Sequence, residues 1–245
     1  MIGDLDHRKT QAQNFEDGLP PDGTSGILKV DSEGNPLSDA ILVDEEDPDS
    51  MLQYYYAYGI RNSFGMDFDH ISQLLWITEN GPGSYDEINV VRPGFNSGWH
   101  KVTGPISRTN MTVESDLVLL EGARYDDPVF SWHIPIGVTD IEFFNSSKLG
   151  DRYRDNIFVG DINNGNLYFF TVNESRTGIT FEVSGDGVQN NQGSLMDLVA
   201  DNQDELSAIT FGTGFEEGIT DIETGPDGYL YILSYGGQLY RIVPR

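Results

Sequence analysis

A strand order that recurs three times along the chain restricts its fold more than any other feature. Each copy opens with an apolar segment that carries an acidic residue, at Gly65–Phe68, Val138–Glu142 and Ile219–Glu223. An apolar strand, a turn and a further strand then follow in each copy. Short strands rich in β-branched and aromatic residues, separated by turn signals, are typical of propeller blades. The repetition therefore predicts an all-β chain built from repeated sheets.

The repeats also predict where the strands lie. The first strand after each opening is expected at Leu74–Ile77, Asn156–Val159 and Tyr229–Leu233, and the next at Glu87–Val91, Asn166–Phe170 and Gln238–Val243. A fourth, partial unit at Gly26–Gly34 is expected to supply the outer strands of a preceding blade. The copies lie roughly 70 to 80 residues apart, which exceeds the about 40 to 50 residues of a usual blade. Long excursions between strands fill the difference, and such loops are where propellers carry function.

The charge of the chain excludes several classes of partner. The 245 residues include 14 basic and 40 acidic side chains, for a formal net charge of -26. Such a chain repels phosphate backbones and anionic membranes, so nucleic-acid binding is not expected. No apolar run approaches the roughly 20 residues of a membrane helix, and no membrane insertion is expected. The densest acidic run, residues 44–49, is either a solvated loop or a loose cation site.

A glycine-rich acidic loop at Glu79–Glu87 is the strongest local signal for a site. Flexible backbone carbonyls there lie beside two carboxylates, Asp86 and Glu87. Calcium takes several oxygen ligands of this kind, and adjacent carboxylates repel each other unless a cation neutralises them. The loop therefore predicts a calcium site. The alternative is that both acids are solvated loop residues.

Three motifs occur in one order around this loop: Gly59-Ile60-Arg61-Asn62, then Gly81-Pro82 with Asp86-Glu87-Ile88-Asn89, then Gly94-Phe95-Asn96-Ser97-Gly98-Trp99. Together they resemble the soluble PQQ-dependent glucose dehydrogenase family, also called glucose/sorbosone dehydrogenases. The resemblance implies a six-bladed β-propeller of four-stranded blades, of which this chain would cover about four. Residues 1–245 would then form a single partial propeller domain, a C-terminal fragment of a longer chain. A smaller closed propeller is the alternative.

The resemblance also implies an activity, the PQQ- and calcium-dependent oxidation of the anomeric hydroxyl of an aldose. The family's general-base histidine lies shortly before a strand that Ile2-Gly3-Asp4 resembles, so it would precede Met1 and be absent from this chain. A small sugar and an electron acceptor would be the partners. The alternative is a calcium-stabilised extracellular binding module without redox activity. By family analogy the protein would be extracellular or periplasmic, although the chain has no signal peptide.

Residue by residue, the resemblance assigns catalytic and cofactor-binding roles to two pairs. Arg61 matches an arginine at the reactive quinone carbonyl, and Asn62 matches its amide partner. Gly81 and Pro82 match backbone-carbonyl ligands of the calcium that sits on the cofactor. The alternative for Arg61 is an ion pair with a carboxylate in the propeller channel.

A second, structural calcium is implied at the acidic end of the loop. Asp86 and Glu87 match its carboxylates, and the Ser97 carbonyl is a further ligand. Asn96, Gly98 and Trp99 are expected to fix a turn and pack a core rather than touch substrate.

The chain departs from the family where cations are expected. Asn163 replaces a lysine, and Gly218 and Thr220 stand where two arginines precede the last blade's aspartate. PQQ carries three carboxylates, which need cationic partners when buried. Loss of these cations weakens the prediction of PQQ binding, whereas the prediction of calcium is unaffected.

Overall fold

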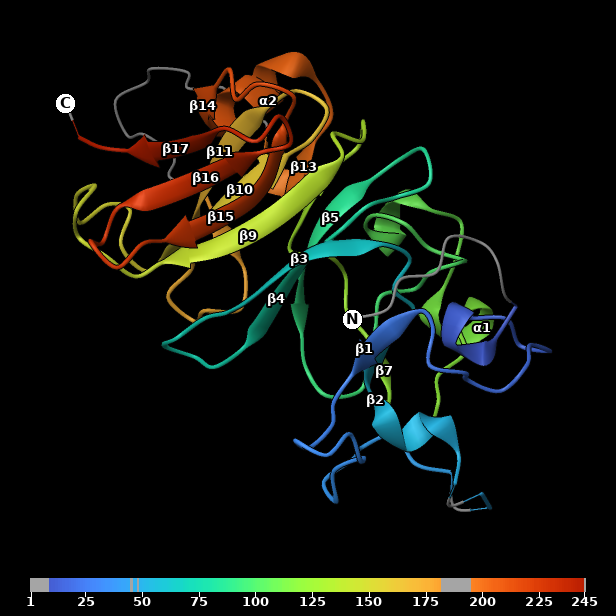
Figure 1. Ribbon diagram of the computed structural model, residues 1–245. Helices are drawn as coiled ribbons and strands as arrows, with labels where there is room; N and C mark the ends of the chain where they lie inside the picture. The colour runs from blue at the N-terminus through green and yellow to red at the C-terminus, as the bar shows by residue number, and fades with distance from the viewer. Residues whose placement is uncertain (1–8, 45, 48, 182–194, 245) are drawn as a thin grey trace. The chain divides into compact units, whose positions relative to one another are not determined.

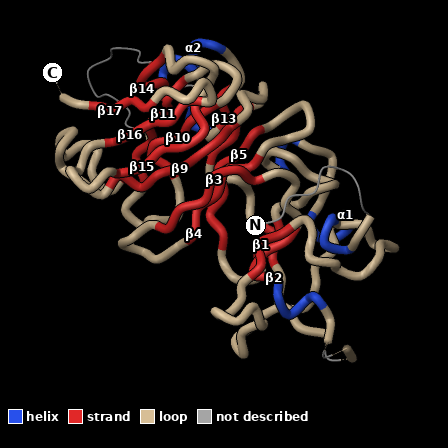
Figure 2. Tube along the Cα trace, in the orientation of Figure 1, coloured by secondary structure: helices blue, strands red, loops and turns tan. Residues whose placement is uncertain are grey.

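The computed structural model describes residues 9–44, 46–47, 49–181 and 195–244 of the chain (Figure 1). Strands make up most of its regular structure, and the helices are short (Figure 2). Contacts divide the chain into two compact units: residues 1–63 with 91–128, and residues 64–90 with 129–245. Ile2-Gly3-Asp4 lies outside the described residues. No helix in the described part is long and apolar enough to cross a membrane.

The first unit contains one mixed sheet with the strand order β1-β2-β6-β7. β1 runs antiparallel to β2, whereas β6 and β7 join in parallel. A small core forms beside it from Ala12, Leu42, Leu52, Tyr55 and Tyr58. The elements of this unit are η1 (Gln11–Gln13), β1 (Gly26–Leu28), η2 (Met51–Tyr54), β2 (Tyr55–Tyr58), β6 (Phe95–Asn96), η3 (Ile106–Arg108), α1 (Val113–Asp116) and β7 (Arg124–Tyr125).

The second unit contains three sheets, made largely of antiparallel strands. One has the order β13-β8-β5-β4-β3, one has the order β12-β11-β10-β9 with β14 added to β11, and one has the order β15-β16-β17. Their strands are β3 (Ser63–Phe68), β4 (Leu75–Glu79), β5 (Asp86–Val91), β8 (Phe130–Trp132), β9 (Val138–Phe144), β10 (Asn156–Asp161), β11 (Asn166–Val172), β12 (Ile179–Thr180), β13 (Val199–Ala200), β14 (Thr210–Thr213), β15 (Ile219–Thr224), β16 (Leu230–Ser234) and β17 (Leu239–Ile242). The helix α2 (Gln203–Ile209) follows β13.

Apolar side chains hold these three sheets together. Trp76 and Trp132 are fully buried in a cluster that joins the first two sheets, and the Trp76 ring meets Phe143 edge-on at 5.5 Å. A second cluster, which includes Phe158 and Ile222, joins the second sheet to the third. Full burial of each large apolar side chain contributes about 1.5 to 3 kcal/mol. The β-branched and aromatic strands predicted from the sequence therefore supply the core.

Carboxylates on the first strand of one sheet also bind the first strand of the next. Asp67 Oδ2 on β3 accepts the Phe143 N–H of β9 at 2.7 Å. Glu142 Oε1 on β9 accepts the Thr224 N–H of β15 at 2.8 Å. Both contacts join an acidic side chain of one opening segment to a backbone N–H of the next.

The structure confirms the strand-rich fold and the strand order of the three copies. It differs from the expectation of uniform four-stranded blades, because the described sheets have four, five, five and three strands and β13 pairs with β8 in parallel. The described acids of the 44–49 run are exposed, as a solvated loop requires. The number of blades, ring closure and the single partial domain stay predictions.

Candidate active site

The loop between β4 and β5 is fastened by the first residue of β5. Asp86 is 1% exposed, and its Oδ1 accepts the Gly81 N–H at 3.0 Å. Its Oδ2 accepts the N–H groups of three consecutive residues, Ile136, Gly137 and Val138, at 2.9, 2.7 and 3.1 Å. Burial raises the pKa of Asp86, and the four backbone donors oppose that rise. The carboxylate therefore joins the loop to the segment before β9.

Glycine is required at the start of this loop. A Cβ at Gly81 would lie 2.1 Å from the Ser84 carbonyl oxygen and 2.2 Å from that of Tyr85. A Cβ at Gly83 would meet nothing within 4 Å. The base of the loop is thus tightly folded and its tip is open.

Glu87 points to the other face of β5, because successive side chains alternate along a strand. It is 4% exposed, and its Oε2 accepts Asn89 Nδ2 at 3.0 Å. Asn89 Nδ2 also reaches Glu79 Oε2 at 3.4 Å. The side chains of Asp86 and Glu87 therefore leave β5 on opposite faces. Within the described residues, no group of three or more acidic or histidine side chains is placed to hold a metal.

Turns from all three sheets of the second unit meet beside this loop, at residues 80–86, 133–138, 161–165 and 216–220, which we call the rim. The Ile162 N–H donates to the Gly137 carbonyl at 2.9 Å, and the Asn163 N–H donates to that of Ile136 at 3.3 Å. A Cβ at Gly218 would lie 2.2 Å from the Ile162 carbonyl oxygen. The structure therefore brings Gly81, Asp86, Asn163 and Gly218 into one continuous region.

Two further residues shape the turns of the rim. Asp161 is fully buried and shapes its turn by accepting the N–H groups of Asn164 and Gly165 at 2.6 and 2.9 Å. Thr220 donates its hydroxyl to the Leu233 carbonyl at 3.1 Å. None of the four rim segments contains lysine or arginine, and His133 is their one basic side chain.

His133 forms an ordered cluster that sequence reasoning missed. Its Nδ1 lies 2.9 Å from Asp201 Oδ1, and its ring stacks on Tyr85 with centroids 4.9 Å apart and planes at 15°. The Tyr85 N–H donates to the His133 carbonyl at 3.1 Å. No local sequence pattern predicts this cluster, because its members come from three separate stretches of the chain.

The other predicted residues lie in the first unit. The Arg61 guanidinium lies over the Trp99 ring at 5.3 Å. Asn62 follows Arg61 in a bend between β2 and β3. Ser97 is 6% exposed, and its N–H donates to the Tyr58 carbonyl at 3.0 Å. Because these residues and the rim belong to different units, their joint action stays a prediction.

The expected structural role of Asn96 is confirmed. Its Oδ1 accepts the Gly98 N–H at 2.9 Å, and its amide exchanges two hydrogen bonds with that of Asn14, at 2.8 and 3.0 Å. Asn96 thus fixes the turn that leads to Trp99.

Comparisons with known proteins agree with the strand-rich fold. The family model for glucose / sorbosone dehydrogenase matches residues 2–241. The aldose sugar dehydrogenase YliI of Escherichia coli (strain K12) is 30% identical over 193 residues, which cover 78% of this chain and 44% of that protein. The solved apo-form of the soluble aldose sugar dehydrogenase of Escherichia coli matches with a TM-score of 0.65 and 26% identity, over 100% of this chain and 60% of that one. The PQQ-bound aldose sugar dehydrogenase of Streptomyces coelicolor shares the fold, with a TM-score of 0.54 and 20% identity, over 90% of this chain and 51% of that one.

Repeated sheets whose turns meet at one rim place this chain in the structural class of the solved sugar dehydrogenases. The chain belongs to the glucose/sorbosone dehydrogenase family. It spans less than half of the length of the curated relative and 60% of the solved one.

Proposed function

We propose that the whole protein oxidises the anomeric hydroxyl of an aldose sugar, with PQQ and calcium as cofactors. Membership of the family and its aldose sugar dehydrogenase relative support this proposal. The observation that carries it is the rim, where the Gly81 loop lies beside Asn163 and Gly218. Residues that the family motifs assign to one site are thus neighbours within the second unit. An extracellular or periplasmic location follows from the same family analogy.

The chain's residues suit the proposed cofactors unequally. PQQ, when bound, supplies the acceptor for the hydride of the sugar, and its carboxylates need positive partners. The rim offers none from lysine or arginine, so its side chains do not supply the positive partners that the quinone needs. Arg61 and Asn62 are the residues proposed to face it.

Calcium is proposed at the Gly81 loop, with backbone carbonyls as its main ligands. The backbone donors already occupy the Asp86 carboxylate, and Glu87 lies on the opposite face of β5. The carbonyls of Gly81 and Pro82 supply ligands for the ion on the cofactor. The structural ion implied at Asp86, Glu87 and the Ser97 carbonyl stays a prediction.

A calcium-stabilised binding module without redox activity is the second candidate. The absence of lysine and arginine from the described rim favours it, because a sugar needs no cationic partner whereas PQQ does. The two candidates share the fold and the calcium and differ in the quinone.

Quinone binding separates the two candidates. The protein is titrated with PQQ in the presence of calcium, and the quinone absorbance is followed after glucose is added. A dehydrogenase binds PQQ saturably and bleaches the absorbance on addition of sugar. Lack of saturable binding refutes the dehydrogenase and leaves the binding module. Calcium has an independent readout, because a chelator must lower the melting temperature if the folded state holds the ion.

A further inference from the structure

We propose that His133, oriented by Asp201, is a sugar-binding residue of the rim that accepts a hydrogen bond from a hydroxyl group of the aldose. This inference rests on the proposed sugar substrate. It does not require the quinone.

The hydrogen bond to Asp201 fixes the position of the proton on the His133 imidazole. The Asp201 carboxylate can only accept, so His133 Nδ1 must carry the proton in the contact of 2.9 Å. In the neutral ring, Nε2 is then left as an acceptor. No described residue donates a hydrogen bond to Nε2, and the His133 side chain is 48% exposed. A free acceptor on a fixed ring is suited to a hydroxyl donor.

The His133 ring is held in place by its neighbours. Tyr85 covers one face of it, and the Tyr85 N–H holds the His133 carbonyl. The His133 N–H donates to the Ala200 carbonyl at 3.0 Å, and the Asp201 N–H donates to Glu205 Oε2 at 2.7 Å. Both the imidazole and its carboxylate partner are therefore held before any ligand arrives. A held side chain loses little conformational entropy on binding.

His133 lies on the rim beside the Gly81 loop. Tyr85 belongs to the Gly81 loop, and Asp86 binds the amides of residues 136–138 in the same segment as His133. Ile134, the next residue, is 67% exposed and adds apolar surface, which suits the C–H groups of a pyranose. The cluster thus combines a hydrogen-bond acceptor with apolar surface at the proposed site.

A second histidine–aspartate pair, at the turn that precedes β4, serves as a matched control. His70 Nε2 lies 3.0 Å from Asp155 Oδ1, and the His70 side chain is 40% exposed. This second histidine–aspartate pair has similar geometry and exposure but lies in the β3–β4 turn, away from the rim. A general effect of sugar on histidines would move both pairs, whereas a rim site moves one.

The test follows the imidazole nitrogens of protein labelled with ¹⁵N-histidine, titrated with glucose and with xylose at pH 8 in the absence of PQQ. We expect a saturable shift of His133 Nε2 with at least one sugar and none at His70. His133→Phe keeps an aromatic ring against Tyr85 and should weaken binding roughly tenfold, the loss expected for one hydrogen bond. His70→Phe should leave the affinity unchanged.

The outcomes distinguish this proposal from the dehydrogenase. A His133 shift without any quinone reduction supports the sugar site and refutes the redox activity. If the PQQ-loaded protein oxidises sugar, His133→Phe should raise KM about tenfold and change kcat little. Oxidation with an unchanged KM in His133→Phe and no shift of Nε2 overturns the proposal while the dehydrogenase stands. Absence of any shift with both sugars in an inactive protein also overturns it.

Discussion

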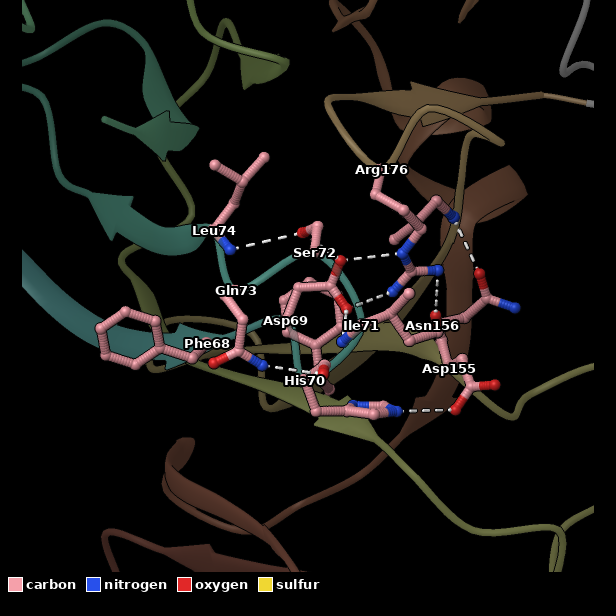
Figure 3. A network of polar contacts seen from close by, with 12 residues as sticks. Phe68, Asp69, His70, Ile71, Ser72, Gln73, Leu74, Asp155, Asn156 and Arg176 are labelled. Atoms are coloured by element: carbon pink, nitrogen blue, oxygen red, sulfur yellow. Dashed lines mark hydrogen bonds and ion pairs between the residues drawn. The ribbon is translucent and has the colours of Figure 1, made fainter. Parts of the chain in front are cut away.

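The ion pair between Asp69 and Arg176 ties the β3–β4 turn to the β11–β12 turn of the neighbouring sheet (Figure 3). Arg176 donates Nε to Asp69 Oδ2 at 2.8 Å and Nη2 to Asp69 Oδ1 at 2.7 Å. Its Nη1 donates to the Asp155 carbonyl at 2.7 Å, and the Ser72 hydroxyl donates to Asp69 Oδ2 at 2.6 Å. The Asp69 side chain is 0% exposed and that of Arg176 is 15% exposed. We predict that Asp69→Asn destabilises the protein strongly.

The magnitude follows from the pKa of Asp69. Burial by itself would raise this pKa, but the hydrogen bonds from Arg176, Ser72 and the Ile71 N–H outweigh it and lower the value from 3.8 to about 2. At 1.36 kcal/mol for each pH unit, the difference corresponds to roughly 2.5 kcal/mol of stability. Loss of one partner of a buried pair costs about 3 to 5 kcal/mol, because the other charge is left uncompensated. We therefore expect Asp69→Asn to lower the free energy of unfolding by about 2.5 to 5 kcal/mol at pH 7.

The sign of the pH dependence is fixed as well. The folded-state pKa lies below the unfolded value, so the stabilisation is complete above about pH 4 and is lost as the pH falls toward 2. The difference in free energy of unfolding between wild type and Asp69→Asn should decrease by about 1 kcal/mol between pH 7 and pH 3.

Urea unfolding followed by tryptophan fluorescence measures this gap, since Trp76 and Trp132 lie in the core of the second unit. The exposed pair Lys29–Asp39 serves as a control, and Asp39→Asn should cost less than about 1 kcal/mol. A loss below about 1 kcal/mol in Asp69→Asn, or a gap that does not change with pH, would refute the reasoning.

Three further predictions concern the second unit. Burial raises the pKa of Glu142 to about 8, so the free energy of unfolding of the wild type should fall by at most about 5 kcal/mol as the pH rises from about 4.5 to about 8. Glu142→Gln should abolish this fall, which melting temperatures at pH 6 and pH 9 would measure. Melting temperatures that change equally in both proteins would contradict the prediction. Asp86→Asn leaves one acceptor oxygen for four N–H donors and should lower the free energy of unfolding by about 2 to 4 kcal/mol. Amide hydrogen exchange at residues 136–138 should become faster, and unchanged exchange would show that Asp86 does not hold this segment. Gly81→Ala should lower the melting temperature because its Cβ meets two carbonyl oxygens, whereas Gly83→Ala should not, and equal effects of the two would disprove the crowding argument.

Much of the fold could be predicted because local sequence patterns mark the strands and their order. The alternation and turn residues of each repeat mark β4, β10 and β16 within a residue or two of their observed bounds. The family motifs likewise predict that Asn96 fixes the turn that follows it. These features depend on neighbours in sequence, which a single chain displays directly.

The details of the site escaped prediction for physical reasons. Asp86 and Glu87 were treated as a pair on a loop, but β5 begins at Asp86, and the pleat sends the two side chains to opposite faces. The His133–Asp201 contact joins residues far apart in sequence, as does the contact between Asp69 and Arg176. Such pairs are selected by tertiary packing, which leaves no periodic signal.

The open tip of the Gly81 loop allows the sequence of this surface to change in evolution. Its base is held by Asp86 and by the crowding around Gly81, whereas a Cβ at Gly83 would meet nothing within 4 Å and Pro82 is exposed. Substitutions or insertions at residues 82–84 alter what the loop presents without disturbing the strands that carry it. The tip of the loop can therefore vary in sequence while its base stays fixed. A library randomised at these positions should yield folded proteins with new ligand preferences.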